Sequence, residues 1–267
     1  PQLGKTLELL QKKGLEYFYQ DEIAKSISES VSNTLTLEDL SSYKAEWKEP
    51  LSLDMFGHQA WTSQPPTQGY LTLTTLKAYE MMESGEFNLH QLIEMYRIFA
   101  SDRDSILYDY KDKLDDFIGT DLGYIEEKIK LFNPKKSELY NSPKPHGGGT
   151  AYMNTVDKNG LGVSLIQSNF HGIGSRIGVG NYGFFLHNRG CGFNLDSQHP
   201  NFLKAGNKPL HTLSPTLWSK NDNLDFIIGT RGGRYQPQLL VQVILPYLLN
   251  LESFENIVKK PRWVIDY

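Results

Sequence analysis

The chain has 267 residues, of which 39% are hydrophobic and 12% are aromatic, so it is long enough to bury the core of one large or two small domains. Charged residues make up 22% and the formal net charge is −4, which gives no indication of a nucleic-acid partner. The single cysteine, Cys191, excludes an internal disulfide and a Cys/His zinc cluster, and it slightly favours a reducing, cytoplasmic compartment.

The longest apolar stretch, residues 239–251, is too short for a membrane span and contains Pro246, so we expect a buried helix there. The chain begins at Pro1 without a methionine. We therefore expect the natural N-terminus to be missing, and the lack of a signal peptide carries little information.

Helical patterns dominate the first half of the chain. Apolar spacing predicts helices over 6–13, 21–31, 71–82, 88–100 and 124–132, with short strands over 50–61 around a turn at Gly57. Thr36 has the character of a helix N-cap. The charges of residues 101–104 fit either an ion-pair knot or, more commonly, a solvated helix face.

A glycine run precedes Thr150. After it, two strand-like runs over 151–156 and 161–166 flank a turn over 157–160. A hydroxyl residue in this position becomes a nucleophile that carries its own base, the new α-amino group, if the Gly149–Thr150 bond is cut. The alternative is that this glycine-rich sequence is a surface linker. His146 either assists self-cleavage or is a solvated loop residue.

Glycine is frequent in the second half, where strands are predicted over 183–186 and 225–228. The second strand leads through Gly232 and Gly233 into the apolar helix that starts near Leu239. A strand, a glycine pair and a helix start can present free backbone N–H groups to an oxyanion. The alternative is a tight turn that needs glycine only for positive φ.

The order and spacing of these segments resemble the γ-glutamyltranspeptidase family of N-terminal nucleophile hydrolases. The matching pieces in the first half are LEYFY at 15–19, TLEDL at 36–40, QPPTQG at 64–69 and SDR at 101–103. Those in the second half are Thr150, VDKNG at 156–160, GFFL at 183–186 with Asn188, KPL at 208–210, SPT at 214–216, the glycine pair at 232–233 and PR at 261–262.

The resemblance implies an α+β fold, a four-layer αββα sandwich that is incomplete at both ends of this chain. It implies one precursor that cuts itself between Gly149 and Thr150. Residues 1–149 would then be the C-terminal part of a large subunit and residues 150–267 the N-terminal part of a small subunit, interleaved in one structural domain. A homodimer is left open, and no cofactor or metal is expected.

The resemblance also implies roles for individual residues. Thr150 would attack an amide carbonyl and pass the acyl group, as an ester, to water or an amine. The N–H groups of Gly232 and Gly233 would hold the oxyanion, and Ser168 would support the nucleophile. Asn169 would belong to the substrate-binding set.

The sequence departs from the γ-glutamyl enzymes where they bind the substrate's α-amino group, because Arg189 and Gly192 stand there and His211 and Thr212 replace paired serines. A cation cannot accept hydrogen bonds from an ammonium group. The Asn-Arg-Gly-x-Gly-Phe pattern at 188–193 instead resembles that of the family's acylase and amidohydrolase branch. Arg189 suits a small amide whose acyl group carries a carboxylate. The alternative for Arg189 is a structural ion pair with Asp196.

Three functions follow from these patterns. The leading hypothesis is an autoprocessing N-terminal-threonine amidohydrolase or acyltransferase. The second is a true γ-glutamyl transferase or glutathione hydrolase with an altered pocket. The third is a catalytically silent fragment or a binding subunit.

Overall fold

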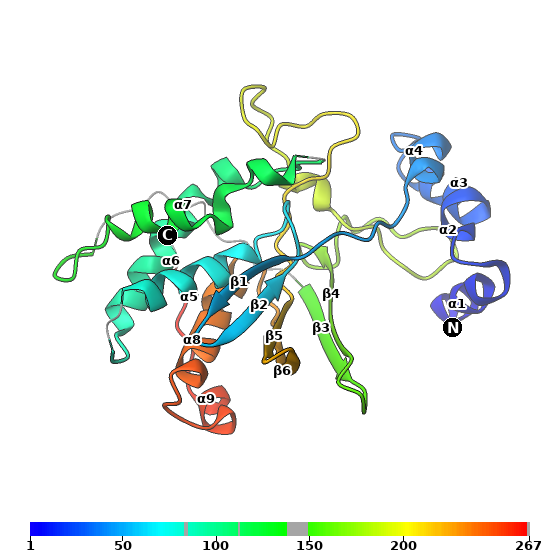
Figure 1. The fold of residues 1–267 in the computed structure, drawn as a ribbon. Coiled ribbons are helices and arrows are strands. Elements are labelled where there is room, and N and C mark those ends of the chain that lie inside the picture. The colour runs from blue at the N-terminus through cyan, green and yellow to red at the C-terminus, as the bar shows by residue number, and fades with distance from the viewer. Residues whose placement is uncertain (83–84, 112, 138–148, 266–267) are drawn as a thin grey trace. The chain divides into compact units, whose positions relative to one another are not determined.

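The computed structural model describes residues 1–82, 85–111, 113–137 and 149–265, which divide into two compact units (Figure 1). The first unit comprises Pro1–Lys48 and Asn169–Asn188, and the second comprises Glu49–Ser168 and Arg189–Tyr267. Each unit therefore contains residues from both sides of the Gly149–Thr150 bond. No helix in the described part of the chain is long and apolar enough to cross a membrane.

The first unit is built from four helices and the 169–188 segment. Its helices are α1 (Gln2–Lys13), α2 (Tyr17–Gln20), α3 (Glu22–Ser30) and α4 (Leu37–Ser42). Ile23, Ile27 and Val179 form its small core, and Thr36 caps α4 as its sequence predicts. These contacts tie the two segments of the unit together.

The strand predicted over 183–186 is wrong. Only an isolated bridge between Gly178 and Phe185 forms there. Gly180 and Gly183 both have positive φ, 41° and 76°, and they turn the chain back on itself before a regular ladder can extend.

The second unit is organised around an antiparallel sheet with strand order β1-β2-β5-β6. The strands are β1 (Leu51–Met55), β2 (His58–Thr62), β5 (Thr216–Lys220) and β6 (Asn223–Ile228). β2 and β5 pair with Thr62 opposite Thr216, so segments from the two halves of the chain meet in the centre of the sheet. The predicted strands around Gly57 and over 225–228 are confirmed, whereas β5 was not expected.

Helices cover one face of this sheet (Figure 1). They are α5 (Tyr70–Met81), α6 (Leu89–Ile106), α7 (Leu122–Ile129), α8 (Gln236–Leu248) and α9 (Phe254–Lys259), with short 3-10 turns η1 (Leu114–Asp116), η2 (Ile118–Thr120), η3 (Arg189–Gly192) and η4 (Gly233–Tyr235). Trp218 of β5 is fully buried with Leu73 and Leu76 of α5 and Ile244 of α8. Burial of these large side chains holds the helices on the sheet.

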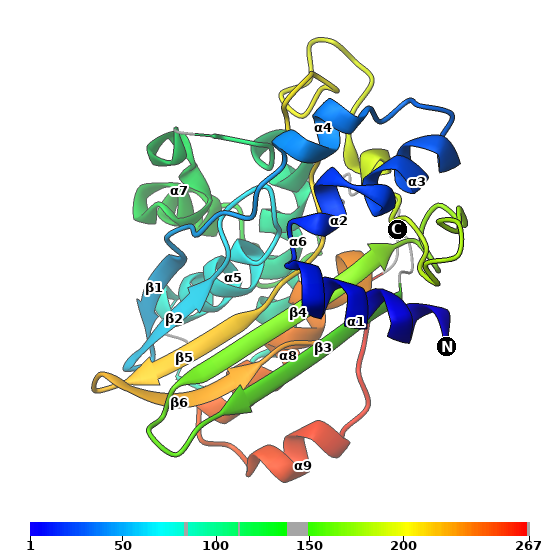
Figure 2. The same cartoon turned by 90° about the vertical axis from the view of Figure 1, so that its right-hand side faces the viewer.

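A two-stranded sheet, β3 (Gly149–Val156) and β4 (Gly162–Phe170), lies on the side of the main sheet away from the helices (Figure 2). Gly162 approaches β6 so closely that a Cβ atom there would lie 2.6 Å from Ile227 Cδ1 and 2.7 Å from Leu224 Cδ2. Helices, main sheet and hairpin thus form three layers of the predicted αββα sandwich. The α+β class is confirmed.

Candidate active site

The predicted cleavage site lies at the start of β3. Gly149 is exposed, Thr150 is half-buried, and Ser168 stands near the end of β4. The Ser168 hydroxyl donates a hydrogen bond to the carbonyl oxygen of Gly149 at 2.7 Å. That carbonyl belongs to the peptide bond before Thr150, so Ser168 contacts the bond that is expected to be cut. His146, Gly147 and Gly148 lie outside the described residues.

β3 is held against the end of β6. The Tyr152 ring lies on Gly229, where a Cβ atom would be 2.2 Å from Tyr152 Cε2, and the Tyr152 hydroxyl is 2.9 Å from Ser164 Oγ. A cavity of about 420 Å³ borders this contact, lined by Tyr152, Asn154, Thr230, Arg262 and apolar side chains of β6, α8 and α9. Tyr152 of β3 therefore lies next to the first residue of the segment 229–234, which we call the glycine turn.

The glycine turn leads from β6 into α8. Gly232 and Gly233 have φ values of 135° and 57°, which only glycine adopts readily. The Gly232 carbonyl accepts from the Tyr235 N–H at 3.0 Å, and the Gly233 carbonyl accepts from the Gln236 N–H. In a trans peptide the N–H points opposite to the carbonyl, so the N–H groups of Gly233 and Arg234 are directed away from the start of α8. The turn is tight, and the role of its N–H groups as oxyanion donors stays a prediction.

Gln68 joins the glycine turn to a second predicted site segment. This side chain is fully buried, and its Nε2 donates to the carbonyl oxygens of Thr212 at 3.0 Å and Gly233 at 2.8 Å. Its Oε1 accepts from Arg103 Nε at 2.9 Å. Neither Gln68 nor Arg103 is among the predicted site residues, although each falls in a motif that carries the family resemblance.

Residues 101–104 form an ion-pair knot, so the more common expectation of a solvated helix face is wrong. Arg103 is 3% exposed and pairs with Asp104 at 2.5 Å, and Asp104 also pairs with Arg234 at 3.4 Å. Asp102 binds Lys128 and the Tyr124 hydroxyl of α7. The reason is that α6 continues to Ile106 and carries these charges between α7 and the glycine turn.

Arg189 and His211, two of the predicted substrate-binding residues, have pKa values that are lowered by their surroundings. Burial lowers the pKa of Arg189 to about 10. Burial, together with the nearby charges of Arg189 and Arg103, lowers the pKa of His211 to about 4, so this imidazole is neutral at pH 7. Asp196 is exposed and accepts from the Gln198 N–H at 3.0 Å, and the described residues form no Arg189–Asp196 ion pair.

Gly192 has a packing reason to be glycine. A Cβ atom there would lie 2.2 Å from the Leu210 carbonyl oxygen. Asn201 bridges the same two segments, because its Nδ2 donates to the Gly192 carbonyl at 2.6 Å and its Oδ1 accepts from the Leu210 N–H at 3.4 Å. Gly192 thus lets η3 approach the chain just before His211.

The 64–69 motif runs alongside residues 211–213. The His211 N–H donates to the Pro66 carbonyl at 3.0 Å, and the Thr67 hydroxyl binds the Leu213 carbonyl. Thr212 is buried between these contacts, at 2% exposure. The first half of the chain therefore supports a predicted substrate-binding segment of the second half.

Asn169 belongs to the first unit, where it is exposed and its Nδ2 donates to the Ile173 carbonyl at 3.4 Å. Its predicted contact with substrate stays a prediction. Across the described ranges, no group of three or more histidine, cysteine or acidic residues is arranged to hold a metal ion.

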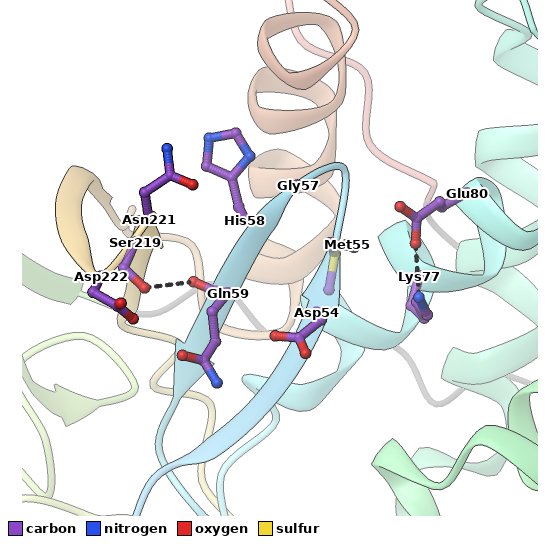
Figure 3. Close-up of a pocket in the computed structure, with 10 residues that line it drawn as sticks. All are labelled: Asp54, Met55, Gly57, His58, Gln59, Lys77, Glu80, Ser219, Asn221 and Asp222. Carbon is purple, nitrogen blue, oxygen red and sulfur yellow. Dashed lines mark hydrogen bonds and ion pairs between the residues drawn. The ribbon is translucent and has the colours of Figure 1, made fainter.

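A separate cavity of about 520 Å³ lies at the β1–β2 and β5–β6 turns, at the other end of the sheet from the glycine turn (Figure 3). Lys77 and Glu80 pair at 2.8 Å on its wall. His58 also lines it, and its Nε2 lies 3.0 Å from Asp225. None of the predicted site residues lines this cavity.

The three layers of helices, main sheet and hairpin are those of the N-terminal nucleophile hydrolase fold. The family model described as gamma-glutamyltranspeptidase matches residues 1–267, and the chain belongs to that family. The predicted resemblance is confirmed.

Two curated relatives are the glutathione hydrolase-like YwrD proenzyme of Bacillus subtilis and the oxamate amidohydrolase proenzyme of Klebsiella pneumoniae. The first is 32% identical over 98% of this chain and 52% of its own length, and the second 30% identical over 99% and 52%. The crystal structure of cephalosporin acylase from Bacillus halodurans is similar with a TM-score of 0.87 and 29% identity, over 99% of this chain and 50% of that protein. The chain thus spans about half the length of these relatives.

Proposed function

We propose that this chain carries the nucleophile and oxyanion site of an autoprocessing N-terminal-threonine amidohydrolase or acyltransferase. The observation that supports this most is the 2.7 Å hydrogen bond from Ser168 to the carbonyl of Gly149, directly before Thr150. Residues 1–149 and 150–267 would belong to a large and a small subunit from one precursor. Because both structural units contain residues from each side of the bond, the two products would stay associated.

In self-cleavage, the Thr150 hydroxyl attacks the Gly149 carbonyl carbon and forms an ester as the C–N bond breaks, and the hydroxyl proton passes to the departing nitrogen of Thr150. Negative charge that develops on the Gly149 oxygen is stabilised by the Ser168 hydroxyl. Water then hydrolyses the ester, which leaves a Gly149 carboxylate and a free Thr150 α-amino group. No other reactant is needed.

In turnover, the free α-amino group of Thr150 takes the proton of its own hydroxyl as the oxygen attacks a substrate amide. The proton passes to the departing amine, and the acyl group remains as an ester on Thr150 until water or an acceptor amine takes it. N–H groups of the glycine turn would stabilise the oxyanion of both steps. Gly232 and Gly233 are the predicted donors, and the directions of their carbonyl groups favour the N–H groups of Gly233 and Arg234.

We propose an acyl group that bears a carboxylate. Arg189 is a buried cation, and the adjoining His211 is neutral at pH 7, so its imidazole can donate one hydrogen bond without adding charge. The relative named oxamate amidohydrolase supports this class. The relative named glutathione hydrolase-like supports the second candidate, a γ-glutamyl substrate, and Asn169 and Thr212 remain proposed substrate contacts in either case.

The mass of the purified protein tests the cleavage. We expect the wild type to give two pieces that separate between Gly149 and Thr150, the Thr150→Ser variant to do the same, and the Thr150→Ala variant to remain whole. A wild type that remains whole and inert would support the third candidate, a silent or binding subunit.

Substrate competition tests specificity. We expect faster turnover of monoamides of dicarboxylic acids than of a γ-glutamyl anilide, and we expect Arg189→Met to remove that preference. Arg176→Met, an exposed arginine of the first unit, is the matched control and should leave the preference unchanged. A strong preference of the wild type for the anilide would reject the proposed acyl group and leave the cleavage proposal intact.

A further inference from the structure

A closed ring of contacts surrounds the glycine turn. Gln68 donates to the Gly233 carbonyl at 2.8 Å, the next residue Arg234 pairs with Asp104, Asp104 pairs with Arg103, and Arg103 donates back to Gln68 at 2.9 Å. We call these five residues the buried ring after its two buried side chains, Gln68 and Arg103; Arg234 and Asp104 are 25% and 36% exposed. Gln68 and Arg103 are 0% and 3% exposed, so their polar groups would be costly to bury without these partners.

Arg103 decides which way the Gln68 amide faces. A guanidinium can only donate, so the Gln68 oxygen must face Arg103 and the amide nitrogen must face the two carbonyls. Both N–H groups of Gln68 are then used, one on Thr212 and one on Gly233. This side chain consequently links the glycine turn to the segment that contains His211 and Thr212.

The ring fixes the location of the glycine turn, whereas the shape of the turn comes from its own bonds. Gly232 and Gly233 have no side chains to anchor them, and the bonds from Tyr235 and Gln236 only close the turn on itself. Gln68, which lies just before α5, and Asp104 of α6 attach the turn to the first half of the chain. A donor that is misplaced by about 1 Å can cost on the order of 10²-fold in rate.

We propose that Gln68 is a positioning residue, which aligns the N–H groups of the glycine turn with the acyl group held beside His211 and Thr212. This inference rests on the proposed amide hydrolysis. It adds to the proposed site a residue from the segment before the cleaved bond, whereas the other proposed residues follow that bond. Gln68 does not touch the reacting atoms. It acts through the backbone of Gly233.

The test compares two buried glutamines in the intact protein. Gln242 is the matched control, because its Nε2 also spans two backbone carbonyls, those of Gln238 at 2.7 Å and Trp263 at 2.8 Å, and it belongs to α8 rather than to the site. Gln68→Glu and Gln242→Glu each replace the donating nitrogen by an oxygen that repels both carbonyls. Gln68→Met has nearly the same length without charge and serves if the glutamate variant does not fold.

Amide turnover is measured on cleaved protein, with folding checked by circular dichroism. We expect Gln68→Glu and Gln68→Met to lower kcat about 10²-fold with KM within about threefold, because the Pro66 and Thr67 contacts still hold residues 211–213. Gln242→Glu should leave kcat within about twofold. Equal losses in the two glutamate variants, or an unchanged kcat in Gln68→Glu, would overturn the inference. A wild type without amide turnover would instead reject the proposed function, and the inference with it.

Discussion

Gly149 and Ser168 are joined by one hydrogen bond at the open end of a hairpin, whereas the buried ring joins five residues inside the second unit. This difference between the cleavage site and the buried ring agrees with the chemical role proposed for each of these two regions. The Gly149 carbonyl has to be released after cleavage, so a single exposed bond is sufficient to hold it. The glycine turn has to keep one geometry before and after cleavage, so it is fixed from several directions, by the buried side chains of Gln68 and Arg103 and by the half-buried Asp104–Arg234 pair.

The largest effect should come from the ring. Replacing Arg103 by methionine removes a buried cation and leaves the Gln68 oxygen without its donor. We expect the free energy of unfolding to fall by about 3 kcal/mol in urea denaturation. Lys130→Met, which breaks the exposed pair with Glu127, should cost less than about 0.5 kcal/mol. A similar small loss for both variants would show that the ring does not stabilise the unit.

The next effect concerns the hairpin. Ser168→Ala removes the donor to Gly149 and should slow self-cleavage about 10²-fold, or ~2.7 kcal/mol of activation free energy, as followed by mass over time. Ser168→Thr keeps the hydroxyl and should cleave at nearly the wild-type rate. Unfolding of the uncleaved precursor should change little, and a large loss of stability in Ser168→Ala would contradict the contrast between the two regions.

His211 should make stability depend on pH. Its pKa is about 4 in the folded state and near the ordinary 6.5 in the unfolded state, so between these values the unfolded chain binds more protons. The contribution of neutral His211 to the free energy of unfolding should therefore be complete above pH 6.5 and should be lost as the pH falls toward 4. The loss between pH 7 and pH 5 is on the order of 2 kcal/mol. Urea denaturation of His211→Asn should give a flatter profile over this range, and identical profiles would refute the assignment.

The smallest effect belongs to the hairpin turn. Asp157 Oδ1 accepts from the N–H groups of Asn159 at 2.8 Å and Leu161 at 2.9 Å on the surface. Asp157→Ala should lower the free energy of unfolding by about 1 kcal/mol, and Asp157→Asn, which retains an acceptor, by less. A loss as large as that of Arg103→Met would mean that the hairpin is as tightly integrated as the ring.

The local signals in the sequence were sufficient for most elements. Apolar spacing located α5 and α8, the Asp157–Gly160 turn located the hairpin, and Thr36 located the start of α4. Prediction was wrong over 183–186, where two glycines with positive φ outweigh an apolar run, and it left out β5. Such errors arise where neighbours distant in the sequence decide the conformation.

By itself the sequence determined the family, the fold class and the position of the proposed nucleophile, because motif order and periodicity are properties of a linear chain. Tertiary structure decided how the surrounding residues are used. Gln68 lies 35 positions from Arg103 and 165 from Gly233, so its role depends on burial and contacts that no local pattern encodes. Gly192 is a second example. In the sequence it is a departure from the family's substrate-binding pattern, whereas in the structure it is the residue at which η3 passes too close to the Leu210 carbonyl for any side chain to fit.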